Sequence, residues 1–196
     1  MRHRLTFAAA VLVTLALTGC ATGQTPTGAA DPIAAITPEP TQPIADVIAS
    51  GSDDAEARAQ AQAWLDDITL PAGATAAPRS VASFQSYSGW PCGPVAELEA
   101  FWFVPDATLS DIAVWLDEHP AGGLISVWGE HRPDSLDYDG MLLGYIPEPG
   151  AQEGIVYTLR TVSGGIAVRA EIAAQTSEAS CPELPDGAQY GAPGMG

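Results

Sequence analysis

The sequence contains no lysine and no asparagine, and it has only seven basic residues compared with 24 acidic ones. Without lysine, the chain cannot perform Schiff-base chemistry, hold a phosphate in a P-loop or use the serine–lysine pair of some acyl enzymes. Without asparagine, it cannot build a cysteine–histidine–asparagine triad. The formal net charge of −17 opposes binding to phosphate backbones and anionic lipid headgroups. We therefore expect no nucleic acid partner.

Histidine is also scarce, with three residues in the chain. His3 lies near the start, and the remaining His119 and His131 are too few for a three-histidine metal site. We expect His119 to interact with the dipole at a helix C-terminus rather than to act as a catalytic base. The sequence favours a protein that is not an enzyme and predicts no catalytic residue, metal or cofactor.

Long apolar runs are absent beyond the first 20 residues. Two arginines precede an apolar run over residues 5–16, which is too short to span a bilayer but typical of a signal peptide. The run ends in the sequence LTGC, which resembles the lipobox of bacterial lipoproteins. This resemblance implies cleavage after residue 19 and acylation of Cys20 by diacylglyceryl and palmitate-type chains, which would anchor the protein on the extracytoplasmic face of the cell membrane. The alternative is an ordinary secretory signal that happens to contain a cysteine.

Cysteine is scarce in the exported part, where only Cys92 and Cys181 follow Cys20. A pair of thiols in an oxidising compartment predicts one disulfide. A metal pair or a redox pair is the alternative, but neither cysteine has the neighbouring cysteine or histidine that such sites need. Closing the long loop between them would stabilise the fold by on the order of 4 kcal/mol.

Proline and periodicity divide the chain into four parts. Residues 1–19 are the expected signal peptide, and residues 20–51, rich in proline, alanine and threonine, predict an extended tether. Residues 52–184 show the periodic patterns of a globular domain. Residues 185–196 predict a flexible C-terminal tail.

Two segments of this domain show helical periodicity. The first begins near Ser52, with Asp53 as the expected cap, and ends before Pro71. The second begins after Thr108, which we expect to cap it together with Asp111, and ends at His119. The apolar stripes are Ala57, Ala61, Trp64, Leu65 and Ile68 in the first helix and Leu109, Ile112, Ala113 and Leu116 in the second.

Five apolar segments predict strands, of which the last two flank Gly164-Gly165. If these glycines form the hairpin turn, Tyr157 lies opposite Ile172, and Arg160 lies opposite Arg169. The apolar residues expected to share one face of this hairpin are Ile155, Tyr157, Leu159, Ile166, Val168, Ala170 and Ile172. The expected fold is therefore α+β, a small antiparallel sheet with one or two helices packed on one face. The segments are residues 97–104, 124–128, 141–146, 155–162 and 166–173.

The opposed Arg160 and Arg169 form the first candidate site, because like charges across a sheet are unfavourable unless an acid or an anion lies between them. Glu171 is the nearest candidate for neutralising them, with Glu97 and Glu99 as alternatives. The other reading is a bound anion or a carboxylate of a partner. These residues therefore predict either an internal ion pair or a contact with another molecule.

Trp90 is the second candidate for a partner contact. Trp64, Trp102 and Trp115 fit apolar positions of predicted helices and strands, and core packing accounts for them. Trp90 instead lies between Gly89 and Pro91, in a loop next to a disulfide cysteine. An exposed aromatic ring on a fixed loop can contact a partner.

Four short motifs lie between residues 70 and 171: LPAGA at 70–74, FW followed by VP at 101–105, WL followed by HP at 115–120, and GIAVRAE at 165–171. Together they resemble a family of actinobacterial secreted proteins and lipoproteins of unknown function. The resemblance implies an architecture and no catalytic residue, and the two cysteines are not part of it. We expect a non-catalytic lipoprotein that binds or assists an envelope protein or a small ligand. The alternative is an envelope hydrolase or transferase that uses a carboxylate pair.

Overall fold

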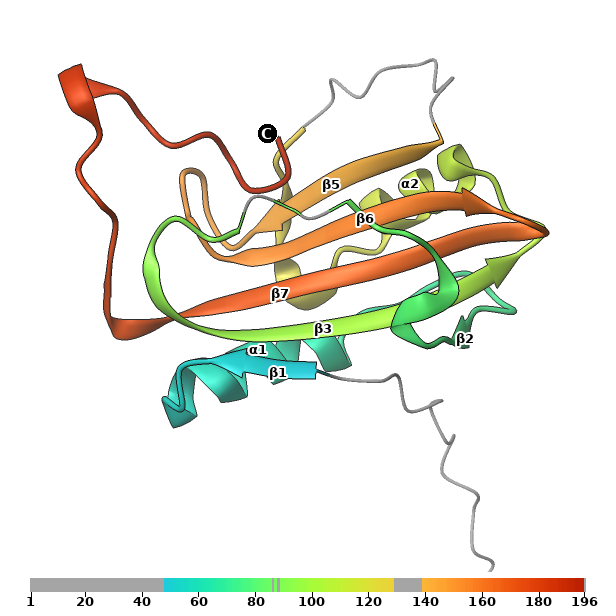
Figure 1. The fold of residues 1–196 in the computed structure, drawn as a ribbon, viewed down its shortest axis with the longest axis horizontal. Coiled ribbons are helices and arrows are strands. Elements are labelled where there is room, and N and C mark those ends of the chain that lie inside the picture. Colours follow the sequence, from blue (N-terminus) through green and yellow to red (C-terminus); the bar gives the residue numbers. More distant parts are fainter. Residues whose placement is uncertain (1–47, 86, 88, 129–138, 196) are drawn as a thin grey trace, which may run out of the picture. The chain divides into compact units, whose positions relative to one another are not determined.

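The computed structural model describes residues 48–195, except residues 86, 88 and 129–138 (Figure 1). These residues form an antiparallel sheet of seven strands with two α-helices, which confirms the predicted α+β class. The predicted signal peptide, Cys20 and the predicted tether up to residue 47 lie outside the described residues. No helix in the described part of the chain is long and apolar enough to cross a membrane.

The sheet has the order β1-β3-β7-β6-β5-β4, and β2 lies beside β3 on the same edge as β1. The long strands β3 and β7 are paired along most of their length. Strand β1 occupies the last four residues of the predicted tether, so the domain begins earlier than expected. The strands are β1 (Ile48–Gly51), β2 (Thr75–Ala76), β3 (Gly93–Pro105), β4 (Ile125–Ser126), β5 (Gly140–Ile146), β6 (Gly154–Val162) and β7 (Gly165–Ser180).

Helix α1 (Ala55–Asp66) begins one residue later than expected. Its cap is Asp54, whose carboxylate accepts hydrogen bonds of 3.1 and 2.9 Å from the backbone N–H groups two and three residues on. The predicted cap, Asp53, instead forms an ion pair of 3.0 Å with Arg58. The prediction was wrong because two adjacent aspartates suit the capping position equally well by composition.

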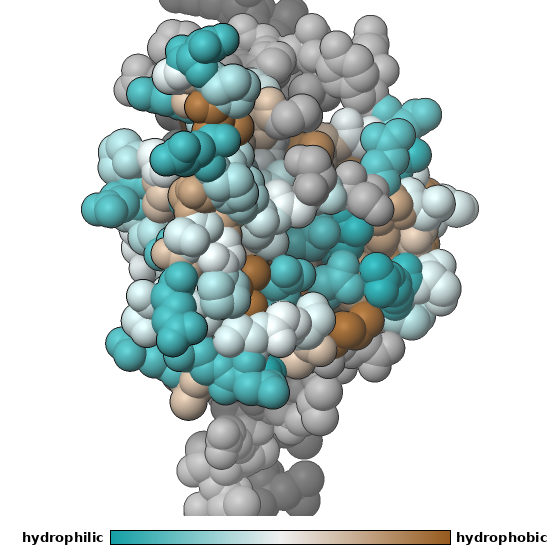
Figure 2. Space-filling model, turned by 60° about the vertical axis from the view of Figure 1, so that its left-hand side comes forward, coloured by the Kyte–Doolittle hydropathy of each residue, from teal (hydrophilic) through white to brown (hydrophobic). Residues whose placement is uncertain are grey.

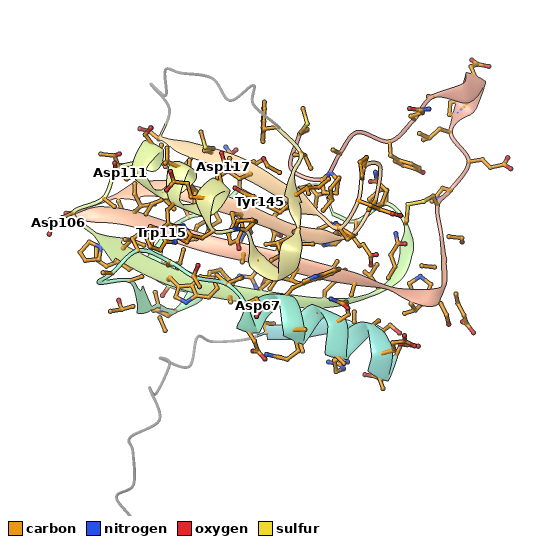
Figure 3. The ribbon with its side chains drawn as sticks, turned by 180° about the vertical axis from the view of Figure 1, so that it is seen from behind. Asp67, Asp106, Asp111, Trp115, Asp117 and Tyr145 are labelled. Carbon is orange, nitrogen blue, oxygen red and sulfur yellow. A yellow bond between two sulfur atoms is a disulfide. The ribbon has the colours of Figure 1, made fainter. Side chains whose placement is uncertain are left out.

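Helix α2 (Leu109–Glu118) has the predicted capping box of Thr108 and Asp111. It ends at His119, as expected. Figure 3 shows the helix from behind, where Asp117 points toward Tyr145 on strand β5. The Tyr145 hydroxyl donates a hydrogen bond of 2.6 Å to the Asp117 carboxylate, which fastens the end of the helix to the sheet.

Both helices pack on one face of the sheet, which we call the helix face (Figures 1 and 3). The apolar residues predicted to share a face in the hairpin do so and are at most 2% exposed. Each isoleucine, leucine or valine among them contributes roughly 1.5–3 kcal/mol when it is fully buried. These residues are Ile155, Tyr157, Leu159, Ile166, Val168, Ala170 and Ile172.

The hairpin register differs from the prediction by two residues. Tyr157 pairs with Ala170 rather than with Ile172, because the turn consists of Ser163 and Gly164. Gly164 has the positive φ of 84° that the turn requires. Gly165 is already in β7, where a Cβ atom would lie 2.1 Å from the carbonyl oxygen of Val104. The second glycine therefore serves the close approach of β3 and not the turn.

The opposite face, which we call the loop face, is covered by two irregular segments. The crossing loop (residues 77–92) runs in front of the sheet in Figure 1, and the C-terminal arm (residues 182–195) returns to the same side. The arm corrects the predicted flexible tail, because Pro193 and Gly194 are buried. A Cβ atom on Gly144 of β5 would lie only 1.8 Å from the Pro193 carbonyl oxygen, so the arm rests directly on this strand.

Candidate functional site

A cavity of about 300 Å³ lies between the crossing loop and the C-terminal arm. One further wall comes from Gln152, in the connection between β5 and β6. None of the lining residues carries a formal charge. They are Tyr87, Gly89, Trp90, Pro91, Gln152, Tyr190, Gly191, Ala192 and Met195.

The predicted disulfide between Cys92 and Cys181 joins the two segments that form this cavity. Cys92 is fully buried at the end of the crossing loop, and Cys181 stands where the C-terminal arm begins. The bond closes a loop of 89 residues, which corresponds to a stabilisation on the order of 4 kcal/mol. The cavity is therefore framed by two irregular segments that a covalent bond holds together.

Two aromatic rings of the crossing loop form a corner of the cavity. The rings of Tyr87 and Trp90 are 5.3 Å apart between centroids and meet at 70°, edge to face. Burial raises the pKa of Tyr87 to about 12, against a hydrogen bond with the backbone of Gly194 that lowers it. The phenol is therefore neutral at physiological pH, and the corner presents aromatic faces without charge.

The polar side chains around the cavity are used to hold the C-terminal arm. The Gln152 amide nitrogen donates a hydrogen bond of 3.3 Å to the Gly191 carbonyl oxygen. The Tyr190 hydroxyl donates one of 2.7 Å to the carbonyl oxygen of Pro182. These donors therefore shape the cavity before any ligand arrives.

Arg169 fastens the middle of the crossing loop to the sheet. It is 4% exposed, and its Nη2 donates to the Gln85 carbonyl oxygen at 2.8 Å and to the Thr158 hydroxyl at 3.0 Å. The guanidinium carbon also lies 5.3 Å from the centre of the Phe84 ring. Nη2 forms an ion pair of 2.5 Å with Glu171, the neutralising partner that the sequence favours.

Glu171 lies directly opposite Glu99 of the neighbouring strand β3. Burial raises the pKa of Glu171 to about 7, since it outweighs the lowering effect of Arg169, and the charges of Glu99 and Glu97 add to the increase. Glu99 in turn lies 3.4 Å from Arg79 of the crossing loop. These carboxylates are therefore engaged with arginines, and neither of the opposed pair lines the cavity.

The predicted opposition of Arg160 and Arg169 is wrong, because it depended on the incorrect hairpin register. Arg160 pairs with Ala167 and Gly140, and Arg169 pairs with Thr158, so the two arginines are diagonal neighbours. An external partner could meet the buried Arg169 only if the crossing loop moved. A contact between another molecule and these residues stays a prediction.

Trp90 is the predicted contact residue that the structure places at the cavity. Tyr87, Tyr190 and Gln152 were missed, because they come from three distant segments and carry no motif. The sequence did contain an indication of this cavity. Tyr87 and Trp90 lie shortly before Cys92, and Tyr190 lies shortly after Cys181. A disulfide between these cysteines brings the aromatic residues to the same end of the domain.

His119 has the helix-end position that the sequence predicts. Its Nδ1 lies 2.9 Å from the carbonyl oxygen of Trp115, one turn earlier, and must carry the proton to donate to it. The imidazole also stacks on the Trp115 ring, with centroids 4.0 Å apart. These contacts terminate α2 and place the histidine on the helix side of the sheet, where the stick view also shows Trp115 (Figure 3).

Within the described residues, no group of three histidine, cysteine or acidic side chains is arranged to hold a metal ion. Comparisons of the chain with protein-family models, with curated proteins and with solved structures find no match. The likeness to actinobacterial secreted proteins thus stays a prediction that rests on the four motifs.

Proposed function

We propose that this chain is an extracytoplasmic lipoprotein, anchored by an acylated Cys20, whose domain binds a small ligand or a partner group and performs no catalysis. The observation that carries the binding role is the aromatic cavity beside the disulfide. Ligand sites are concave, mostly apolar and preformed, with few polar groups. The cavity of this protein meets this description, since three aromatic rings, one methionine and a single amide side chain line it.

The anchor is supported by the sequence at residues 17–20 and agrees with the disulfide. Structural disulfides form in oxidising compartments outside the cytoplasm, and this chain carries one between Cys92 and Cys181. The high acidity of the exported part agrees with display at a surface, because like charges keep such domains apart and in solution.

The catalytic alternative receives less support from the carboxylates. Glycoside hydrolysis needs two carboxyl groups that flank a substrate bond across a cleft. Glu99 and Glu171 face each other on adjacent strands, but each is engaged with an arginine, and the cavity has no acidic lining residue. A binding role requires neither carboxylate.

The anchor is tested by comparing the wild-type chain with Cys20→Ala in a bacterium that makes lipoproteins. We expect the wild-type protein to incorporate a lipid probe and to fractionate with membranes, whereas the variant should do neither. A Cys20→Ala protein that still incorporates the probe would overturn the anchor.

The binding role is tested by crosslinking in whole cells and identification of the crosslinked component. We compare the wild-type chain, Trp90→Ala and the control Val114→Ala, which truncates a 47% exposed side chain on α2. We expect one component to be recovered with the wild type and the control and lost with Trp90→Ala. Its absence throughout, or its recovery with Trp90→Ala, would contradict the proposal.

A further inference from the structure

We propose that the aromatic cavity binds a quaternary ammonium group of the size found in choline or glycine betaine. This inference rests on the proposed binding function and names the class of ligand. Four properties of the cavity support it: the arrangement of its rings, the state of its polar groups, its charge and its size.

Three aromatic side chains line the cavity, and aromatic rings are the groups from which cation sites of this kind are built. A cation gains most when aromatic faces surround it, and recognition of quaternary ammonium groups is the main use of such cages. Tyr87 and Trp90 are in edge-to-face contact at 70°, and Tyr190 lines the same cavity from the C-terminal arm. All three side chains are half-buried.

Two of the side-chain donors around the cavity are already used within the protein. The Tyr190 hydroxyl and the Gln152 amide nitrogen already donate to backbone carbonyl oxygens, and Tyr87 is hydrogen-bonded with the backbone of Gly194. A sugar would bring several hydroxyl groups, each of which loses free energy when it is buried without a partner. A quaternary ammonium has no N–H group and pays no such penalty.

The charge of the surroundings favours a cation. No arginine lines the cavity, and the net charge of the chain is −17. An acidic domain raises the local concentration of cations, whereas it repels anionic ligands.

The size of the site fits a headgroup better than a macromolecule. A volume of about 300 Å³ is at the lower end of the range for ligand sites. Figure 2 brings the left-hand end of Figure 1 forward, and its apolar groups appear as small, separate patches among hydrophilic ones. Protein partners usually meet a larger continuous apolar patch.

The test is calorimetric titration of the exported chain, made water-soluble by Cys20→Ala, with choline chloride and with 3,3-dimethyl-1-butanol. The alcohol has the shape of choline without its charge. We expect choline to bind at least about tenfold more tightly than the alcohol, the difference that about 1.4 kcal/mol of cation–π attraction produces. Equal binding of the two compounds, or no binding of choline, would overturn the proposal.

Variants locate the site. Trp90→Ala should weaken choline binding at least about tenfold, Trp90→Phe, which keeps an aromatic face, should weaken it less, and Val114→Ala should leave it unchanged. Circular dichroism and thermal unfolding establish that the variants fold. Unaltered choline affinity in a folded Trp90→Ala protein would place the site elsewhere and refute the assignment.

Vesicles distinguish a free solute from a lipid headgroup. Binding to phosphatidylcholine vesicles but not to phosphatidylglycerol vesicles, with competition by choline, would identify the headgroup as a source of the same chemistry. Binding to choline alone would identify a free solute. A Trp90-dependent partner found by crosslinking, without any choline binding, would refute the ligand class and leave the proposed binding function intact.

Discussion

The two faces of the sheet are made by the same strands but are covered in different ways. On the helix face, two amphipathic helices bury a continuous set of apolar side chains. On the loop face, irregular segments cover buried polar residues, among them Arg169, Thr158 and Gln152. Apolar burial is non-directional, whereas hydrogen bonds and ion pairs hold one segment in one place. The helix face therefore provides stability, and the loop face provides a shaped site.

This difference predicts how each face opens. Proteins open locally where few apolar contacts must be broken, and binding segments come from that part of the structure. The crossing loop is fastened at its middle by Arg169 and Phe84 and at its end by the disulfide at Cys92. We expect it to open between these points before the helices separate from the sheet.

The largest effect is expected on the helix face. Ile112 of α2 is fully buried, and Ile112→Ala should lower the free energy of unfolding by about 2 to 5 kcal/mol through lost burial and a cavity. Urea unfolding measures the change, and Val114→Ala on the exposed side of the same helix should shift it by less than about 0.5 kcal/mol. Equal effects of the two substitutions would show that α2 contributes no core.

A smaller and local effect is expected on the loop face. Gly144→Ala places a Cβ atom against the Pro193 carbonyl oxygen, so the C-terminal arm must move. We expect faster hydrogen exchange of the arm amides and a loss of less than about 2 kcal/mol in the free energy of unfolding. Gly191→Ala is the matched control, because an added Cβ atom there meets nothing within 4 Å. Unchanged exchange in Gly144→Ala would mean that the arm does not rest on β5 in solution.

The same comparison explains what could be predicted from the sequence. The helix face repeats apolar residues at helical and strand spacing. Both helices, the shared face of the hairpin and the helical stripes were predicted from it, except that Ile68 lies beyond the end of α1. The register was wrong because two adjacent glycines offered two turns, and only contact with Val104 of β3 decides between them. This contact joins strands that are distant in the sequence, so local sequence patterns do not predict it.

Little of the loop face could be predicted from the sequence. Residues 77–92 and 182–195 have no periodicity, and proline and glycine in the arm indicated a free tail. The arm is ordered by contacts with distant residues, such as the hydrogen bond from Gln152 to Gly191. The disulfide and Trp90 were recognised by their chemistry, but the cavity between them depends on three segments that only the fold brings together.

The smallest expected effect concerns the balance between burial and charge on the loop face. Folding raises the pKa of Glu171 from an ordinary value of 4.5 to about 7, chiefly through burial. Below pH 4.5 the carboxyl is protonated in both states, so it has no effect on the pH dependence. Between about pH 4.5 and 7 the folded protein binds this proton more tightly than the unfolded chain, so stability falls as the pH rises. Above pH 7 the carboxyl is ionised in both states, so the free energy of unfolding no longer falls because of this group.

Glu171→Gln should therefore lose less stability between pH 5 and pH 8 than the wild type, when both are followed by urea unfolding. Arg79, Arg169, Glu97 and Glu99 face this group and remain in the variant, so the difference isolates Glu171. Glu178→Gln, at an exposed position of the same strand, should behave like the wild type. If the wild type instead gains stability relative to Glu171→Gln as the pH rises, the ion pair with Arg169 outweighs burial. The ion pair between Glu171 and Arg169 would then stabilise the folded state. The attachment of the crossing loop through Arg169 would strengthen rather than weaken above neutral pH.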